Sequence, residues 1–312
     1  MSDRFERILD VADARASSGH DAGANPSQRD IVMADLDGPR ESEVPDVLLL
    51  HGQPGSSLIW TRVQTLLHGR GLHALAVDRP GYGATGGPAM DHSDNAATLA
   101  QILDERQCTP AVVVGHSLGA GIAVALAAAA PHHVRALVLV APAVGSDAVT
   151  ATDRALAAPV LGAGLSWLGF RTAGLMLCLP GLRRRVLTDR IGLSATEGKE
   201  VVRRMTRGPV WRSFAVEQRY LIADADRLKE QLGEVRCPVV VVAGARDRVV
   251  RPRVAAAMAS RLPESTLLTT DTGHLIPIED PEAVVTAVLR ALRWEYRRSL
   301  FSTRSTVPVA DP

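Results

Sequence analysis

Ser117 lies in a Gly-His-Ser-Leu-Gly segment, residues 115–119, between two runs of apolar residues. The β-branched run 112–114 is typical of a buried parallel strand, and the alanine-rich run 123–129 favours a helix that can lie close to a sheet. The glycines at both ends of the segment have no Cβ, so strand and helix can approach each other while the serine adopts a strained conformation with its hydroxyl exposed. This strand, turn and helix arrangement predicts a nucleophilic serine.

Two residues that could complete a catalytic site follow predicted strands later in the chain. Asp247 comes after the apolar run 238–243, and His274 comes after the run 265–270. A serine nucleophile needs a histidine as general base and a carboxylate that orients the histidine. The order serine, acid, histidine differs from that of chymotrypsin-like and subtilisin-like enzymes.

With these residues the chain resembles the α/β-hydrolase superfamily, in the branch whose core carries an inserted cap domain. Four further segments are similar to family motifs: an oxyanion loop at 48–55, a strand and turn at 77–83, an acid loop at 244–247 and a histidine loop at 272–274. The resemblance covers roughly residues 30–295. It implies an α/β fold, with a mostly parallel twisted sheet, helices on both faces and a helical cap inserted before the acid-bearing strand.

The resemblance also implies the roles of individual residues. Ser117 would be the nucleophile, His274 the base and Asp247 the acid. The backbone N–H groups of Gln53 and Leu118 would form the oxyanion hole. No cofactor and no metal is implied.

Other residues compete for some of these roles. Asp271 and Asp147 are rival acids, but Asp247 is favoured because Gly-x-x-Asp directly follows a buried strand. His51 and His116 are interpreted as structural, since one triad requires one base.

A serine at the turn between strand and helix favours acyl transfer. Dehalogenases and epoxide hydrolases instead carry out alkyl displacement with a carboxylate at this position. We therefore expect a carboxylesterase-like serine hydrolase that cleaves an ester or related carbonyl compound through an acyl-enzyme. Perhydrolases, lactonases and carbon–carbon bond hydrolases use the same triad and stay open as alternatives. A ligand-binding protein of this fold without catalysis is the non-enzyme alternative.

Composition agrees with a globular enzyme. The 312 residues are 46% hydrophobic and 22% charged, and a net charge of +1 argues against a nucleic-acid binder. The cysteines, Cys108, Cys178 and Cys237, are scattered and odd in number, so we expect reduced core residues. The first residues lack the apolar stretch of a signal peptide, which predicts a cytoplasmic location. Nothing in the sequence indicates an oligomeric state.

Strands and helices alternate along most of the chain, which predicts a mostly parallel sheet with helices on both faces. The predicted strands are residues 47–51, 72–77, 111–116, 135–140, 238–243 and 265–270, with an antiparallel edge strand near 31–36. The predicted domains are an N-terminal extension and linker (1–27), a core (28–142 and 233–298), a helical cap (143–232) and a C-terminal tail (299–312).

The predicted cap begins with a long apolar segment, residues 156–182. Its glycines, Pro180 and the central Arg171 interrupt it, so packed helices are favoured over a membrane span. Such helices would lie over Ser117 and line a pocket for a hydrophobic small-molecule substrate.

The second part of the predicted cap is basic. Residues 171–219 contain eleven Lys or Arg against four Asp or Glu, whereas residues 1–50 contain eleven acids against five arginines. The favoured interpretation is a solvated helix face. The alternatives are contact with the acidic N-terminal segment, an anionic substrate or an anionic membrane surface. If an anionic substrate binds there, Arg183, Arg184 and Arg185 are expected to rim the pocket entrance.

Overall fold

The computed structural model describes residues 33–34, 47–105, 110–207 and 210–304, with the backbone alone for 34, 207 and 295–304. The extension and linker predicted for residues 1–27 lie outside the described residues, and so does Cys108.

Seven strands form one sheet in the order β1-β3-β2-β4-β5-β6-β7. All neighbouring strands are parallel except β1, which pairs antiparallel with β3 at the edge. The strands are β1 Met33–Ala34, β2 Val47–Leu50, β3 Ala74–Val77, β4 Ala111–His116, β5 Val134–Val140, β6 Val239–Gly244 and β7 Ser265–Thr270. The predicted fold class is confirmed, and each predicted strand is present within a few residues.

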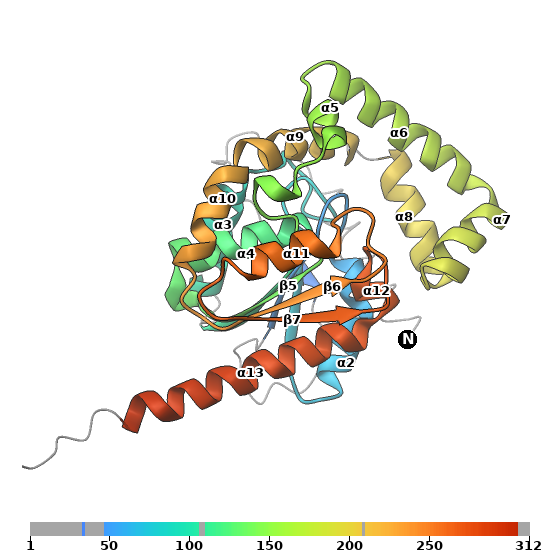
Figure 1. Ribbon diagram of the computed structural model, residues 1–312. Helices are drawn as coiled ribbons and strands as arrows, with labels where there is room; N and C mark the ends of the chain where they lie inside the picture. Colours follow the sequence, from blue (N-terminus) through green and yellow to red (C-terminus); the bar gives the residue numbers. More distant parts are fainter. Residues whose placement is uncertain (1–32, 35–46, 106–109, 208–209, 305–312) are drawn as a thin grey trace, which may run out of the picture.

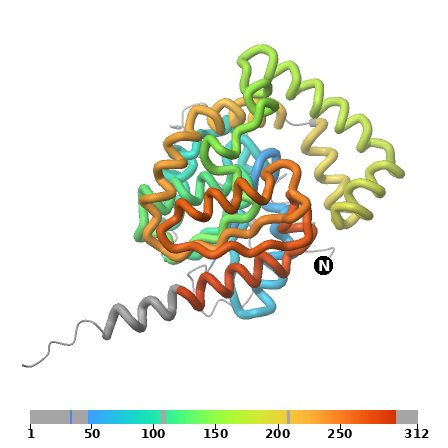
Figure 2. The backbone as a smooth tube through the Cα atoms, viewed as in Figure 1, coloured from blue at the N-terminus to red at the C-terminus, as the bar shows by residue number. Residues whose placement is uncertain are grey.

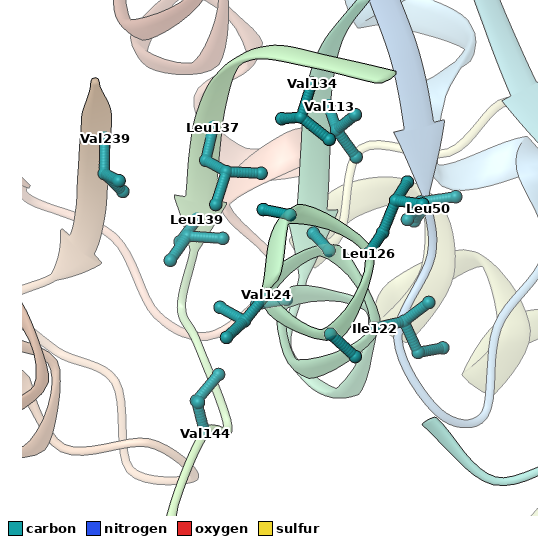
Figure 3. Close-up of a cluster of buried hydrophobic side chains, with 14 of the residues drawn as sticks. Leu50, Val113, Ile122, Val124, Leu126, Val134, Leu137, Leu139, Val144 and Val239 are labelled. Carbon is teal, nitrogen blue, oxygen red and sulfur yellow. The ribbon is translucent and has the colours of Figure 1, made fainter. Parts of the chain in front are cut away.

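Helices cover both faces of the sheet (Figure 1). One face packs against α3 His92–Glu105, α4 Leu118–Ala129, α10 Ala225–Gln231 and α11 Pro252–Ala259; the other packs against α2 Thr61–His68, α12 Ile276–Glu279 and α13 Pro281–Arg304. Figure 3 shows apolar side chains of α4 gathered with those of the neighbouring strands. Because both faces are covered, β2, β3, β4 and β6 are buried along their whole length, and they consist mainly of Val, Leu and Ala.

Between β5 and β6 the chain forms a helical insertion, residues 143–232 (Figure 2). It contains α5 Ala151–Ala157, α6 Leu161–Cys178, α7 Pro180–Arg183, α8 Ala195–Arg207, α9 Val210–Ala223 and α10, with a π-helical stretch, Arg184–Arg190. Helices α6, α7 and α8 project away from the sheet (Figure 1). Helix α10 instead packs on the sheet, because its Leu228 is fully buried in the core beside α4.

No single helix in the described part of the chain is long and apolar enough to cross a membrane. Helices α5 and α6 together have the length and apolar composition of a membrane span, but they are bent by 101° at the break between them.

Two details differ from the sequence-based expectations. Helix α13 continues to Arg304, so the tail predicted from residue 299 begins too early. Cys178, expected in the core, is exposed at the end of α6, and Cys237 is half-buried. Cys178 is exposed because α6 lies at the outside of the molecule rather than against the sheet (Figure 1).

Candidate active site

Ser117 forms the tight turn between β4 and α4. Its backbone has φ 53° and ψ −118°, in the left-handed region that side-chain-bearing residues rarely adopt. A Cβ on Gly115 would collide with the carbonyl oxygen of Gly119, and one on Gly119 would lie 2.6 Å from the carbonyl oxygen of Leu50. The two glycines are therefore required by the close approach of strand and helix, as the sequence predicts.

The three residues of the predicted triad lie side by side. The His274 ring has Nδ1 2.8 Å from Oδ2 of Asp247 and Nε2 3.1 Å from Oγ of Ser117. Asp247 is buried, and its Oδ1 accepts hydrogen bonds from the backbone N–H groups of Val249 and Val250 at 2.8 and 3.0 Å. A carboxylate can only accept, so Nδ1 of His274 is the donor, and Nε2 is left to accept the serine proton.

Neither rival acid faces the histidine. Asp271 is exposed and pairs with Arg246 at 3.1 Å. Asp147 pairs with Lys229 at 3.0 Å and lies 3.7 Å from Arg261. The geometry therefore brings only Asp247, of the three candidate acids, to His274.

His116 supports the loop that carries the candidate base. It is buried, and its Nε2 lies 2.9 Å from the backbone carbonyl of His274. Burial, together with the neighbouring His274, lowers the pKa of His116 to about 3. His116 is therefore neutral at physiological pH and donates to that carbonyl, which agrees with a structural role.

His51 has a similar supporting position in the oxyanion loop. Its Nε2 accepts a hydrogen bond from the backbone N–H of Arg79 at 3.1 Å, so its Nδ1 donates to the carbonyl of Gly52 at 2.7 Å. Burial holds the pKa of His51 well below its ordinary value, and the charge of Arg79 acts in the same direction.

The oxyanion loop lies directly against the serine. A Cβ on Gly52 would be 2.8 Å from Cβ of Ser117. The carbonyl of Gly52 and the N–H of Gln53 belong to one peptide unit, and this carbonyl also accepts a hydrogen bond from Nη2 of Arg79 at 3.1 Å. Gln53 lines the cleft at Ser117, and Leu118 is the first residue of α4.

A buried ion pair, which the sequence did not reveal, connects this loop with the insertion. Arg79 is completely buried and donates to Glu217 of α9 and to the carbonyl of His51. The hydroxyl of Tyr82 donates to the same carboxylate at 2.7 Å. Burial raises the pKa of Tyr82 well above its ordinary value, and the charge of Glu217 adds to this shift. A buried arginine requires an acidic partner, but no sequence pattern identifies one located 138 residues away.

Ser117 and His274 lie in a cleft with a volume of about 1060 Å³. Its apolar lining includes Ile59, Leu156, Val186, Ile191, Phe214, Leu221, Val249 and Leu275, and its charged lining is Arg190, Arg246, Arg248, Asp153 and Glu279.

Two expectations about the cleft were wrong. Of the apolar segment 156–182 only Leu156 lines the cleft, and Arg183, Arg184 and Arg185 are not part of its lining. For the apolar segment the reason is the orientation of α6, which buries small residues and turns most of its large ones outward.

Within the described residues, one group of side chains has atoms close enough together to hold a metal ion: Asp104, His132 and His133. His133 directly precedes the start of β5. This group therefore lies at the amino ends of the parallel strands, whereas Ser117 lies at their carboxyl ends.

Comparison with known proteins identifies the family. A model of the alpha/beta hydrolase family matches residues 47–287, which is most of the chain. The chain belongs to this family. The match covers the sheet from β2 to β7, the insertion and all five predicted site residues.

Relatives within the alpha/beta hydrolase family include esterases and a lipase, and they support hydrolase activity. A pimeloyl-[acyl-carrier protein] methyl ester esterase from Aromatoleum aromaticum is 30% identical over 76% of this chain and 94% of its own length. Lipase LipV from Mycobacterium tuberculosis is 40% identical, but over 36% of this chain and 44% of its own length. The fold is similar to that of the putative non-heme bromoperoxidase BpoC from Mycobacterium tuberculosis, with a TM-score of 0.63, 23% identity and coverage of 89% and 99% of the two chains.

Proposed function

We propose that this protein is a serine hydrolase that cleaves an ester or related carbonyl substrate through an acyl-enzyme. The observation that carries the proposal is the continuous hydrogen-bonded chain from Ser117 through His274 to Asp247. The strained elbow at Ser117 supports it, because such strain is typical of a positioned nucleophile.

In the first half-reaction Oγ of Ser117 attacks the substrate carbonyl, and Nε2 of His274 takes the serine proton. Asp247 holds the imidazole ring in the required tautomer and stabilises its positive form. The same proton then passes from His274 to the leaving group, which departs as an alcohol.

The tetrahedral oxyanion would be stabilised by the backbone N–H groups of Gln53 and Leu118. The Leu118 N–H lies at the start of α4, where helix N–H groups have no partner within the helix. The Gly52 carbonyl accepts hydrogen bonds from His51 and Arg79, which fix the peptide unit that carries the Gln53 N–H. Each such donor is worth roughly 3 kcal/mol of transition-state stabilisation.

In the second half-reaction water attacks the acyl-enzyme while His274 again acts as base, and the acid product and free Ser117 are released. None of these steps requires a metal or a cofactor. The largely apolar cleft lining supports a hydrophobic small molecule as the substrate, and the esterase and lipase relatives agree with ester hydrolysis.

Perhydrolysis is the second candidate function. A relative in Mycobacterium phage D29, 25% identical over 79% of this chain, is named a putative non-heme haloperoxidase. The same acyl-enzyme would then be attacked by hydrogen peroxide and release a peracid.

The test combines active-site labelling with a substrate panel. A fluorophosphonate should label the wild-type chain and not the Ser117→Ala variant, and a series of p-nitrophenyl esters, a lactone and a peracid assay should separate the reaction classes. If the wild-type chain is not labelled, it is a non-catalytic binding protein and the proposal fails.

A further inference from the structure

Helix α6 buries its small residues and exposes its large ones. Its buried positions are Gly162, Ser166, Phe170, Gly174 and Leu177. Eight of the ten large exposed apolar side chains in the described part of the chain lie in or beside this helix: Val160, Leu161, Leu165, Trp167, Leu168, Leu175, Met176 and Leu179. A helix surrounded by water normally shows the opposite pattern. We call these eight residues the outer face.

The buried side of α6 shows why the helix lies this way round. A Cβ on Gly162 would collide with the carbonyl of Leu156 at the end of α5, and one on Gly174 would lie 2.6 Å from Cγ2 of Thr206 on α8. The small residues therefore allow close contact with the neighbouring helices. Small residues at the packing side and large apolar residues on the outside are the pattern of helices in contact with lipid.

The segment that carries the outer face has arginine as its only charged residue type. Between Asp153 and Asp189 the chain has five arginines and no acidic residue. The guanidinium of Arg171 lies 5.8 Å from the ring centre of Trp167, and the side chain of Arg184 is 80% exposed.

This charge pattern favours a lipid surface over a second copy of the chain. A second copy that packs its own outer face against this one would need carboxylates next to that face to pair with these arginines. Asp153 is hydrogen-bonded to Thr150 at the start of α5, and Asp189 lies 3.8 Å from Arg184 of its own chain. An anionic bilayer supplies both an apolar layer for the leucines and phosphates for the arginines.

We propose that α6 docks on the surface of an anionic phospholipid bilayer. The helix lies along the interface, with the outer face among the headgroups and the first acyl carbons. Its 18 residues extend about 27 Å, which suits a helix lying flat. On the buried side, Phe170 contacts Phe214 at a ring distance of 5.5 Å, and Phe214 lines the cleft. Docking would therefore place one wall of the cleft close to the lipid.

Vesicle sedimentation with the full chain tests the proposal. The wild-type chain should sediment with vesicles of phosphatidylcholine and phosphatidylglycerol and much less with phosphatidylcholine alone. The triple variant Leu161→Ser, Leu168→Ser, Leu175→Ser should lose binding by more than about tenfold, because each leucine contributes buried apolar area. The variant Arg183→Gln, Arg184→Gln, Arg185→Gln should lose on the order of a hundredfold on the anionic vesicles.

A matched control uses the two large exposed apolar residues of the described chain that do not belong to the outer face. The double variant Val249→Ser, Leu267→Ser removes comparable side chains and should bind vesicles like the wild type. Equal loss in this control and in the leucine variant would overturn the assignment to α6.

Trp167 provides a second test, which reads the wild-type chain directly and needs only one conservative substitution. Brominated lipids in anionic vesicles should quench part of the tryptophan fluorescence of the wild type, and Trp167→Phe should remove that part. Absence of quenching, or quenching that persists in Trp167→Phe, would overturn the proposal. A stable dimer that Leu161→Ser, Leu168→Ser, Leu175→Ser dissociates would also overturn it, in favour of a second copy. Binding is measured without turnover, so this test is independent of the proposed hydrolase activity.

Discussion

At the scale of single residues, the serine hydroxyl is the group whose loss should matter most for turnover and least for stability. Ser117→Ala removes the nucleophile, while a methyl group fits the same turn. We expect esterase activity to fall below about a tenth of wild type, with the residual rate set by the oxyanion hole and binding. The melting temperature should stay within a few degrees. Retention of a larger activity would exclude Ser117 as the nucleophile.

Asp271, the exposed rival acid, is the control residue for Asp247. Asp247→Asn removes the acceptor that fixes the His274 tautomer, so kcat should fall by a factor on the order of 10⁴. Asp271→Asn should leave kcat close to wild type, because its carboxylate pairs with Arg246 at the surface. Steady-state kinetics of both variants distinguish them, and a large loss in Asp271→Asn would reverse the assignment of the acid.

His116 should make the stability of the protein depend on pH. Its pKa is about 3 in the folded state and about 6.5 when unfolded, so the unfolded state binds the proton first as the pH falls. Stability should therefore be full above about pH 6.5 and decrease below it. Between pH 7 and pH 5 this histidine accounts for about 2 kcal/mol. Urea unfolding at both pH values should show a smaller decrease in His116→Gln, and an equal decrease would contradict the shift.

At the scale of elements, the buried pair of Arg79 and Glu217 joins helix α9 to the oxyanion loop. Glu217→Gln leaves the arginine buried without a charged partner, which costs about 3–5 kcal/mol. The exposed pair of Arg70 and Glu282 is the control, and Glu282→Gln should cost less than about 1 kcal/mol. Urea unfolding measures the stability of both variants.

In Glu217→Gln we also expect kcat to fall, since Arg79 holds the Gly52 carbonyl. An unchanged kcat would show that the ion pair does not contribute to catalysis.

The strands were predictable from sequence, and the faces of α6 were not. β4 and β6 are short β-branched runs followed by turns that fix their ends, so local pattern is sufficient. Helix α6 is apolar around most of its circumference, and its pattern favours no side. Its orientation is set by close packing of Gly162 and Gly174 on α5 and α8.

The candidate triad, unlike the faces of α6, could be predicted from local sequence pattern. Each of its residues lies at or shortly after the carboxyl end of a strand of one sheet, so knowing the strands was enough to place Ser117, Asp247 and His274 together. The partnership of Arg79 with Glu217 depends on how α9 lies over the core, and no local sequence feature encodes that.

At the scale of the whole molecule, the overall charge is near balance, but arginines gather at the cleft. Arg190 and Arg248 line it and are exposed. Replacing both with Gln should lower kcat/KM for an anionic ester and reduce its dependence on salt, with no change for a neutral ester of equal chain length. Arg183→Gln, Arg184→Gln, Arg185→Gln is the control and should leave both substrates unaffected in the absence of lipid. Equal salt profiles for both esters would contradict electrostatic steering.

The distance along the chain between Ser117 and His274, 157 residues, has a consequence during synthesis. A ribosome that adds 5 to 20 residues per second needs roughly 8 to 30 s to pass from one to the other. During that interval the ribosome makes first the apolar insertion and then Asp247, and the nascent chain carries Ser117 without its base until His274 is added. Hydrolytic activity can therefore begin only when translation is almost finished, and α6 leaves the ribosome exit tunnel before the last two strands of the sheet exist.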